Sequence, residues 1–295
     1  MTREVRRSRS SLALALGQVR YQLVVLLRSP LSFFVAVVIP LLLLVSLNVL
    51  IPGEPVAGLP YAQWLTPAMC AFCLLNACYV TSIISIVLAR EEGILKRLRG
   101  TPLPAWTYLL GRAGSAAVTS VLACAVIIAI AVAFFDVRII WAGMGYFVAA
   151  LALGIVCFFL VGAALTILVP KSETALPIAF GSMLPLAFIS GVFFEPSNPP
   201  GWLHYLSLAF PVQPVAKAME DAFNPTNHGW PMPLPGLLVV LGWSLASIAA
   251  IAIAFRWEPG PSRITMGLPI PKNRRQWRRH GRSGDRATTT AGRAS

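Results

Sequence analysis

Long apolar runs separated by short polar or charged stretches dominate the pattern of this 295-residue chain. Six of these runs are near or above the roughly 20 residues that a helix needs to cross a bilayer core. They cover residues 31–51, 64–89, 113–135, 142–169, 176–194 and 236–255, and none contains Asp, Glu, Lys or Arg. The pattern predicts an all-α membrane protein with six transmembrane helices, the third and fourth joined by a short hairpin at "DVRIIW".

The composition supports a membrane protein. Hydrophobic residues make up 57% of the chain and charged residues only 12%, which is outside the range of ordinary soluble domains. A formal net charge of +13 raises the question of nucleic-acid binding. The basic residues, however, lie mainly in the two terminal regions and in one loop, which membrane topology explains more simply. We therefore expect no nucleic-acid partner.

The distribution of Lys and Arg predicts the orientation in the membrane. If residues 1–30 lie inside, 22 of the 24 basic residues fall on the inner side. Because inner loops carry an excess of Lys and Arg, both termini are predicted to be cytoplasmic. The expected location is the plasma membrane, with multiple crossings.

Residues 1–30 form a separate predicted region. Apolar residues recur at positions 12, 16, 19, 23 and 26, with Ser11, Gln18 and Gln22 on the opposite face. This spacing predicts an amphipathic helix along the inner membrane surface, where its basic residues favour anionic lipid. The helix is either an anchor alone or an additional contact surface. A cleaved signal peptide is disfavoured, because polar residues interrupt the apolar run before it is long enough.

The most highly charged stretch is "REEGILKRLRGTPLP", residues 90–104, between the second and third predicted spans. Glu91 and Glu92 are predicted to begin a short helix that basic residues end, which the helix dipole favours. Gly100 and the prolines after it would stop that helix. Two interpretations remain open at this point: a partner binds the apolar ridge of the helix, or the stretch is a solvated turn whose arginines obey topology.

This loop resembles the corresponding loop of ABC-2 type permeases, the membrane subunits of ATP-binding-cassette exporters. The segment "LPLAFISGVFFEPSNPPGWLHYLSLAFPVQPVAKAMEDAF", residues 184–223, also resembles the family's ending, with a fifth span and an extracellular re-entrant segment. The resemblance covers roughly residues 10–256. It implies a six-helix transmembrane domain over residues 31–256, paired with a second permease copy and with two separate ATPase subunits.

The resemblance also implies site residues. The loop would be a coupling helix that sits in a groove of the ATPase through Glu91, Glu92, Gly93, Leu95, Lys96, Arg97, Leu98 and Arg99. Candidates for the substrate path lie within the predicted spans, and for the polar ones the alternative is hydrogen bonding between helices. These candidates are Asn48, Asn76, Thr81, Ser82 and Phe188.

The absence of certain motifs is consistent with ATP hydrolysis on a separate subunit. It contains no G-x-x-x-x-G-K-[ST] phosphate loop and no H-E-x-x-H motif. We therefore expect neither catalysis nor a cofactor on this chain, with ATP and Mg²⁺ on the partner ATPase. The interiors of the predicted spans contain no charged residues, and this absence disfavours a proton- or sodium-coupled carrier. The five cysteines lie in apolar sequence and are predicted to be packing residues.

The expected function is ATP-driven efflux of a lipophilic compound such as a drug or antibiotic, because the spans supply mostly apolar walls. Export of a lipid or glycolipid is the first alternative. An ATP-independent secondary carrier and a membrane scaffold without transport remain as further alternatives. Residues 257–295 form a basic tail without apolar periodicity, predicted to be disordered and to lie against anionic headgroups.

Overall fold

The computed structural model describes residues 30–50, 56, 58–94, 105–193, 201–226 and 232–254. All of these belong to one compact unit, Met1–Gly260. The predicted amphipathic helix before residue 30, the loop residues 95–104 and the tail from residue 257 lie outside the described residues.

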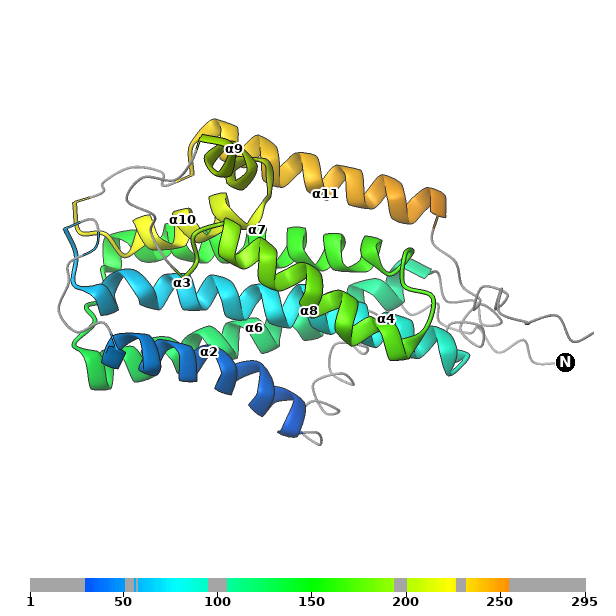
Figure 1. Ribbon diagram of the computed structural model, residues 1–295, viewed down its shortest axis with the longest axis horizontal. Coiled ribbons are helices and arrows are strands. Elements are labelled where there is room, and N and C mark those ends of the chain that lie inside the picture. The colour runs from blue at the N-terminus through cyan, green and yellow to red at the C-terminus, as the bar shows by residue number, and fades with distance from the viewer. Residues whose placement is uncertain are drawn as a thin grey trace, which may run out of the picture. The chain divides into compact units, whose positions relative to one another are not determined.

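The described residues are helical and contain no strand; an isolated bridge pairs Val56 with Leu59 (Figure 1). The predicted all-α class is therefore confirmed. In chain order the helices are α2 (Pro30–Leu50), α3 (Tyr61–Leu75), the π-helix η1 (Asn76–Val80), α4 (Thr81–Glu91), α6 (Ala105–Phe135), α7 (Trp141–Leu165), α8 (Ser172–Ile189), α9 (Gly201–Ala209), α10 (Val212–Ala222) and α11 (Leu234–Ala254).

Five helices of the described residues are long and apolar enough to cross a membrane. They correspond to the second to sixth predicted spans, although α6 already begins at Ala105 and α7 ends at Leu165. The first predicted span is helical as α2, whose described apolar part, Val37–Leu50, is shorter than a full crossing. The crossing by residues 31–51 thus stays a prediction.

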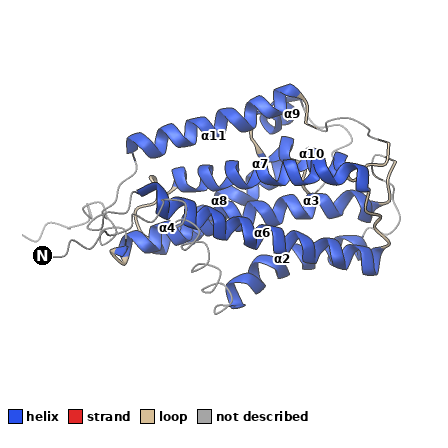
Figure 2. Cartoon of the chain, turned by 180° about the vertical axis from the view of Figure 1, so that it is seen from behind, coloured by secondary structure: helices blue, strands red, loops and turns tan. Residues whose placement is uncertain are grey.

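One continuous helix, formed by α3, η1 and α4, lies at the centre of the bundle (Figures 1 and 2). It runs from Tyr61 to Glu91 and packs against α2, α6, α7, α8 and α10. In its most apolar part 78% of the residues are buried, compared with 11% in α11. The central helix is therefore the element against which the other helices are positioned.

The hairpin between α6 and α7 is confirmed at residues 136–140. Asp136 adopts a positive φ of 54°, which reverses the chain directly after α6 ends. Such a conformation is tolerated by Asp better than by most residues, because its short side chain can bond to nearby backbone.

The region predicted to be re-entrant contains two short helices, α9 and α10. The buried side of α10, with Val212, Val215 and Met219, packs against α3 and α7. By contrast, α9 exposes Trp202 and Tyr205, the aromatic types that favour membrane interfaces. A dip of this region into the outer leaflet stays a prediction.

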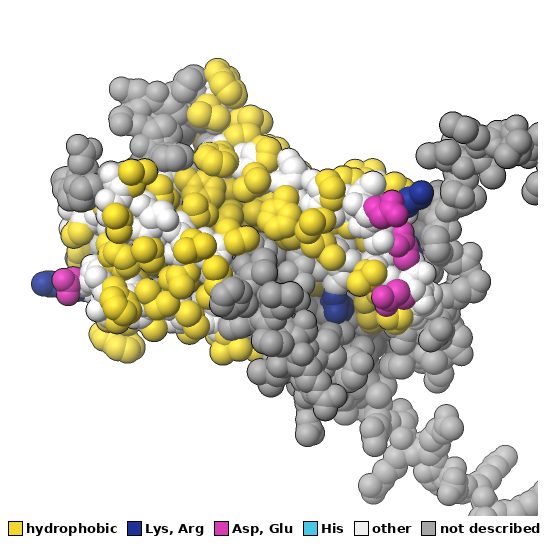
Figure 3. All heavy atoms as spheres, turned by 60° about the horizontal axis from the view of Figure 1, so that its bottom comes forward, with side chains coloured by type: hydrophobic (Ala, Val, Ile, Leu, Met, Phe, Trp, Pro, Cys, Tyr) yellow, Lys and Arg dark blue, Asp and Glu magenta, His cyan; other side chains and the backbone are white. Residues whose placement is uncertain are grey.

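The surface is apolar between its two charged ends. Figure 3 shows hydrophobic side chains over the middle of the visible face, with most of the acidic and basic side chains near the ends. On α11 the exposed side chains form an apolar face: Leu238, Leu241, Leu245, Ile248 and Ile253. Because water does not favour so much exposed apolar surface, the chain is built to be surrounded by lipid.

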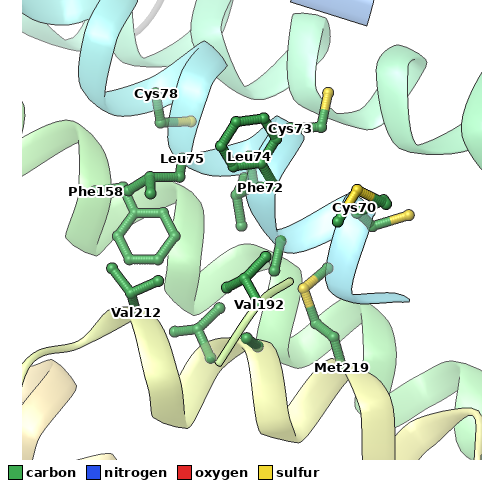
Figure 4. Packing of buried hydrophobic residues seen from close by; sticks show 14 of the residues in the cluster. Cys70, Phe72, Cys73, Leu74, Leu75, Cys78, Phe158, Val192, Val212 and Met219 are labelled. Atoms are coloured by element: carbon green, nitrogen blue, oxygen red, sulfur yellow. The ribbon is translucent and has the colours of Figure 1, made fainter. Parts of the chain in front are cut away.

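The five cysteines are buried, as expected for packing residues. Cys70, Cys73 and Cys78 lie on the central helix, among side chains such as Phe72 and Phe158 (Figure 4). Within the described ranges, no group of three or more His, Cys, Asp or Glu side chains could hold a metal ion.

Candidate functional site

Arg90, in the last turn of α4, folds its guanidinium back onto the end of α7. Its side chain is buried, with 7% exposed. Nη1 donates a hydrogen bond to the carbonyl of Thr166 (3.2 Å), and Nη2 donates to the carbonyl of Val169. The last carbonyls of a helix have no partner within it and carry partial negative charge. Thr166 is the C-cap residue of α7 and Val169 lies in the turn after it, so Arg90 places its positive charge at the carbonyl end of α7 and holds the turn that follows.

Glu91, the next residue, binds the opposite kind of helix end. The backbone N–H of Ser172 donates to Glu91 Oε1 (2.7 Å), and the Ser172 hydroxyl donates to Glu91 Oε2. Ser172 is the first residue of α8, where backbone N–H groups lack partners within the helix and carry partial positive charge. The carboxylate of Glu91 is thus a cap for α8 supplied by another helix.

Together, Arg90 and Glu91 hold both sides of the turn that joins α7 to α8. We call these two residues and their partners Thr166, Val169 and Ser172 the α4 clamp. Its signs match the two helix dipoles, since the cation meets the C-terminus of α7 and the anion meets the N-terminus of α8. Two adjacent residues thereby connect three helices.

The chain turns away directly after the clamp. Glu92 N–H donates to the Leu88 carbonyl (2.9 Å), and Gly93 N–H donates to the Arg90 carbonyl (3.3 Å). Gly93 has a φ of +68°, a left-handed conformation that side chains disfavour and that commonly ends helices. The prediction that Glu91 and Glu92 begin a new helix was wrong: Glu91 is the last residue of α4 and Glu92 is its C-cap, because the helix ends only at Gly93.

Glu92, Gly93 and Ile94 leave the bundle at this point. Glu92 is exposed, and so is Ile94, a large apolar residue with 38% of its surface accessible. The remaining residues predicted to bind an ATPase lie outside the described residues: Leu95, Lys96, Arg97, Leu98 and Arg99. Their role stays a prediction.

The substrate-path candidates fall into separate places. Asn76, Thr81 and Ser82 lie together at the junction of η1 and α4, whereas Asn48 is on α2 and Phe188 is near the end of α8. The Asn48 amide donates to the Leu44 carbonyl (2.8 Å), within its own helix. Phe188 is 57% exposed, and its ring lies 4.8 Å from that of Phe193. The structure thus groups three of the five candidates.

Two of the grouped side chains form local hydrogen bonds. The Ser82 hydroxyl donates to the Cys78 carbonyl, and the Thr81 hydroxyl donates to the Asn76 carbonyl (3.4 Å). Asn76 is buried, and its side-chain Nδ2 has no hydrogen-bond partner. An unpaired amide is costly in an apolar environment, so Asn76 remains the strongest candidate for a ligand contact.

The π-helix η1 connects the central helix to both α7 and α8. A Cβ added at Gly162 would come 2.7 Å from the Tyr79 carbonyl oxygen, so glycine is required for α7 to approach so closely. The Tyr79 hydroxyl forms a hydrogen bond with the Ser182 hydroxyl on α8 (2.7 Å). π-Helical turns are rare and frequently occur at functional sites.

A second set of long-range hydrogen bonds lies at the other end of the central helix, around Gln63. The side-chain Nε2 of Gln63 donates hydrogen bonds to the carbonyls of Arg138 (2.9 Å) and Phe223 (3.1 Å). Its Oε1 accepts a hydrogen bond from the Arg138 backbone N–H (2.8 Å). Gln63 thus holds the α6–α7 hairpin and the end of α10 with a neutral, buried side chain. We call this arrangement the Gln63 tie.

Sequence reasoning selected Glu91 but no other residue of the α4 clamp, and it selected none of the residues of the Gln63 tie or of the Tyr79–Ser182 contact. Arg90 had been counted only as a topology residue, and Gln63, Tyr79, Ser172 and Ser182 were not singled out. One local signal was available: Pro170, Lys171 and Ser172 are followed by Glu173, a pattern typical of a helix start. Their long-range partners are separated by at least 75 residues and leave no local pattern.

The long apolar helices and their lipid-compatible surface define an all-helical membrane protein. The family model of the ABC-2 type transporter matches residues 18–223, which is more than half of the chain. The chain therefore belongs to this family, whose members are membrane subunits of transporters.

Two curated relatives are similar to this chain. Both are called "Probable multidrug ABC transporter permease YbhR", from Escherichia coli strain K12 and from Escherichia coli O157:H7. Each is 27% identical over 163 residues, which cover 53% of this chain. The match spans 42% of the length of each relative.

Proposed function

We propose that this chain is the permease subunit of an ABC exporter and forms the membrane path for a lipophilic compound. Membership of the ABC-2 type transporter family is the observation that carries this proposal. The chain itself has no phosphate-loop motif, so ATP and Mg²⁺ bind to a separate ATPase subunit in this scheme. Two permease copies and two ATPase subunits form the proposed complex.

The end of α4 is the proposed contact with the ATPase. Residues 92–99 follow the α4 clamp directly, and Glu92 and Ile94, in the described part of this segment, are exposed. An exposed apolar residue beside charged ones suits a groove on a partner better than open water. In the proposed orientation this end and both termini are cytoplasmic.

The proposed substrate is lipophilic. The helices present mainly Leu, Val, Ile, Ala and Phe, and apolar walls bind apolar molecules. The names of the two relatives describe probable multidrug permeases, which supports a drug or antibiotic substrate. Asn76 would supply a polar contact within an otherwise apolar path.

Transport into inside-out vesicles tests this function. The full chain is produced with a candidate ABC ATPase subunit, and uptake of the lipophilic dye Hoechst 33342 is followed after MgATP is added. We expect dye uptake that needs both subunits and that stops when the catalytic glutamate of the ATPase is changed to glutamine. Uptake without any ATPase, or no ATPase in the purified complex, contradicts the proposal.

A further inference from the structure

We infer that Arg90 and Glu91 are positioning residues that connect the end of α4 to the α7–α8 turn, so that movement of the following loop is passed to α8. This inference rests on the proposed function, in which an ATPase moves that loop. It assigns Glu91 to a contact within the chain, whereas Glu92 faces the partner.

The two adjacent glutamates have different surroundings. Both carboxylate oxygens of Glu91 accept hydrogen bonds from Ser172. Glu92 is exposed, and no hydrogen bond joins its carboxylate to another residue in the described part of the chain. Ser172 occupies about two of the four lone-pair sites of the Glu91 carboxylate and holds this exposed group in one direction, toward the start of α8. The Glu92 carboxylate is not held in this way by any described residue.

α8 is the helix that such a connection would move. Its main packing neighbours are α4, η1 and α9, and 22% of its residues are buried in its most apolar part. It is linked to the central helix twice, by Glu91 at its first residue and by Tyr79 at Ser182. A helix held chiefly by one neighbour follows the movement of that neighbour, because little other packing opposes it.

Arg90 makes the connection two-sided. Without it, a pull on Glu91 could separate α8 from α7 and distort the turn between them. The guanidinium binds the Thr166 and Val169 carbonyls while Glu91 binds Ser172, so the α7–α8 turn is held by hydrogen bonds at both ends. The α4 clamp therefore transmits displacement in either direction.

Three substitutions separate this role from binding of the ATPase. Glu91→Ala removes both acceptors of the clamp, and Glu92→Ala is the matched control at the neighbouring carboxylate. Ser172→Pro removes both donors without touching α4. Proline suits the first position of a helix, and the extended conformation of Lys171 (φ −137°, ψ 154°) is the one favoured before proline.

Two measurements are made on the full complex. The first is the amount of ATPase that co-purifies with the permease. The second is the distance between spin labels attached after Leu110→Cys and Glu173→Cys, two exposed positions near the starts of α6 and α8. Distances are recorded without nucleotide and after trapping with MgATP and vanadate. The buried native cysteines provide a label-free background, which is checked in the parent chain.

We expect Glu91→Ala and Ser172→Pro to keep the bound ATPase and to lose the ATP-dependent change in distance. Glu92→Ala should lower the amount of bound ATPase instead. Loss of the ATPase in Glu91→Ala, or an undiminished distance change in either clamp variant, overturns the inference. Unchanged ATPase binding in Glu92→Ala also overturns the assignment of the two glutamates.

The proposed function fails separately, and this is visible before any variant is compared. In that case the parent complex binds no ATPase or shows no ATP-dependent distance change. Size-exclusion profiles and thermal midpoints of the variants identify any variant that does not fold. Ser172→Ala, which keeps the backbone donor, then replaces Ser172→Pro, and a partial loss of the distance change is expected.

Discussion

The two ends of the central helix hold their neighbours by different chemistry. At the start, Gln63 uses one neutral amide to hold the α6–α7 hairpin and the end of α10. At the other end, Arg90 and Glu91 use opposite charges to hold the α7–α8 turn, and the Glu91 contact is exposed. A buried neutral tie depends on geometry alone, whereas charge contacts respond to salt and to nearby charges.

This difference suggests a fixed end and an adjustable end. Buried amide bonds are lost only at the cost of leaving polar groups unpaired. Exposed charge-assisted bonds exchange more easily with water and with a charged partner. The adjustable end is the one that continues into the loop proposed to contact the ATPase.

Gln63→Leu should have the largest effect on stability. It leaves the Arg138 N–H and the carbonyls of Arg138 and Phe223 without their partner, at a cost of roughly 2–4 kcal/mol. Thermal unfolding of the purified protein measures this cost, with Leu238→Ala on the exposed face of α11 as a control. A midpoint equal to that of the parent would show that the Gln63 tie contributes little.

Arg90→Leu should have a smaller effect, of about 1–2 kcal/mol, because it leaves two carbonyls without a donor rather than three backbone groups, and the Thr166 carbonyl still accepts a hydrogen bond from the Val169 N–H (3.3 Å). Arg90→Lys is the informative comparison. A single ammonium does not reproduce the fork that reaches both carbonyls, so it should fall between the parent and Arg90→Leu. If lysine and arginine give the same midpoint, charge alone explains the contact.

Ser172→Ala should destabilise the chain by less, about 0.5–1 kcal/mol, since the backbone N–H of residue 172 still binds Glu91. In a chain that already carries Glu91→Ala, Ser172→Ala is expected to cause almost no further loss of stability. Equal effects of Ser172→Ala in both backgrounds would mean that the hydroxyl acts independently of Glu91.

Salt should produce the smallest difference and compares the two ends directly. Raising the ionic strength from 0.05 to about 0.5 M shortens the screening length and should speed amide hydrogen exchange at the start of α8 by a small factor. Exchange at residues 136–140, held by the neutral Gln63 tie, should stay constant. A parallel change at both ends would remove the distinction between them.

The sequence predicted the apolar helices well because burial in lipid depends on composition over a window. Residues 64–89 and 236–255 were recognised in this way. The start of α6 was missed because Gly111 and Arg112 interrupt the apolar run, although the helix itself continues through them. Hydropathy reports where lipid begins rather than where a helix begins.

The candidate site was predicted only in part, for a different reason. Glu91 was selected because its loop resembles the coupling loop of ABC-2 type permeases, and Asn76 because it is a polar residue within an apolar span. Their partners could not be selected, since Ser172 lies 81 residues from Glu91 and no local pattern connects them. Likewise, the local sequence of residues 76–80 does not indicate the π-helix η1, because the same residues are compatible with an ordinary α-helix.

The π-helix η1 changes the direction in which the last side chains of the central helix point. An α-helix advances about 100° per residue around its axis, so the additional residue in a π turn rotates everything beyond it by about that angle. Arg90 and Glu91 come ten or more residues after η1 and inherit this rotation. Shortening the chain by one residue at Ala77 would restore regular winding and swing both side chains to another azimuth, away from the helix ends that they now cap.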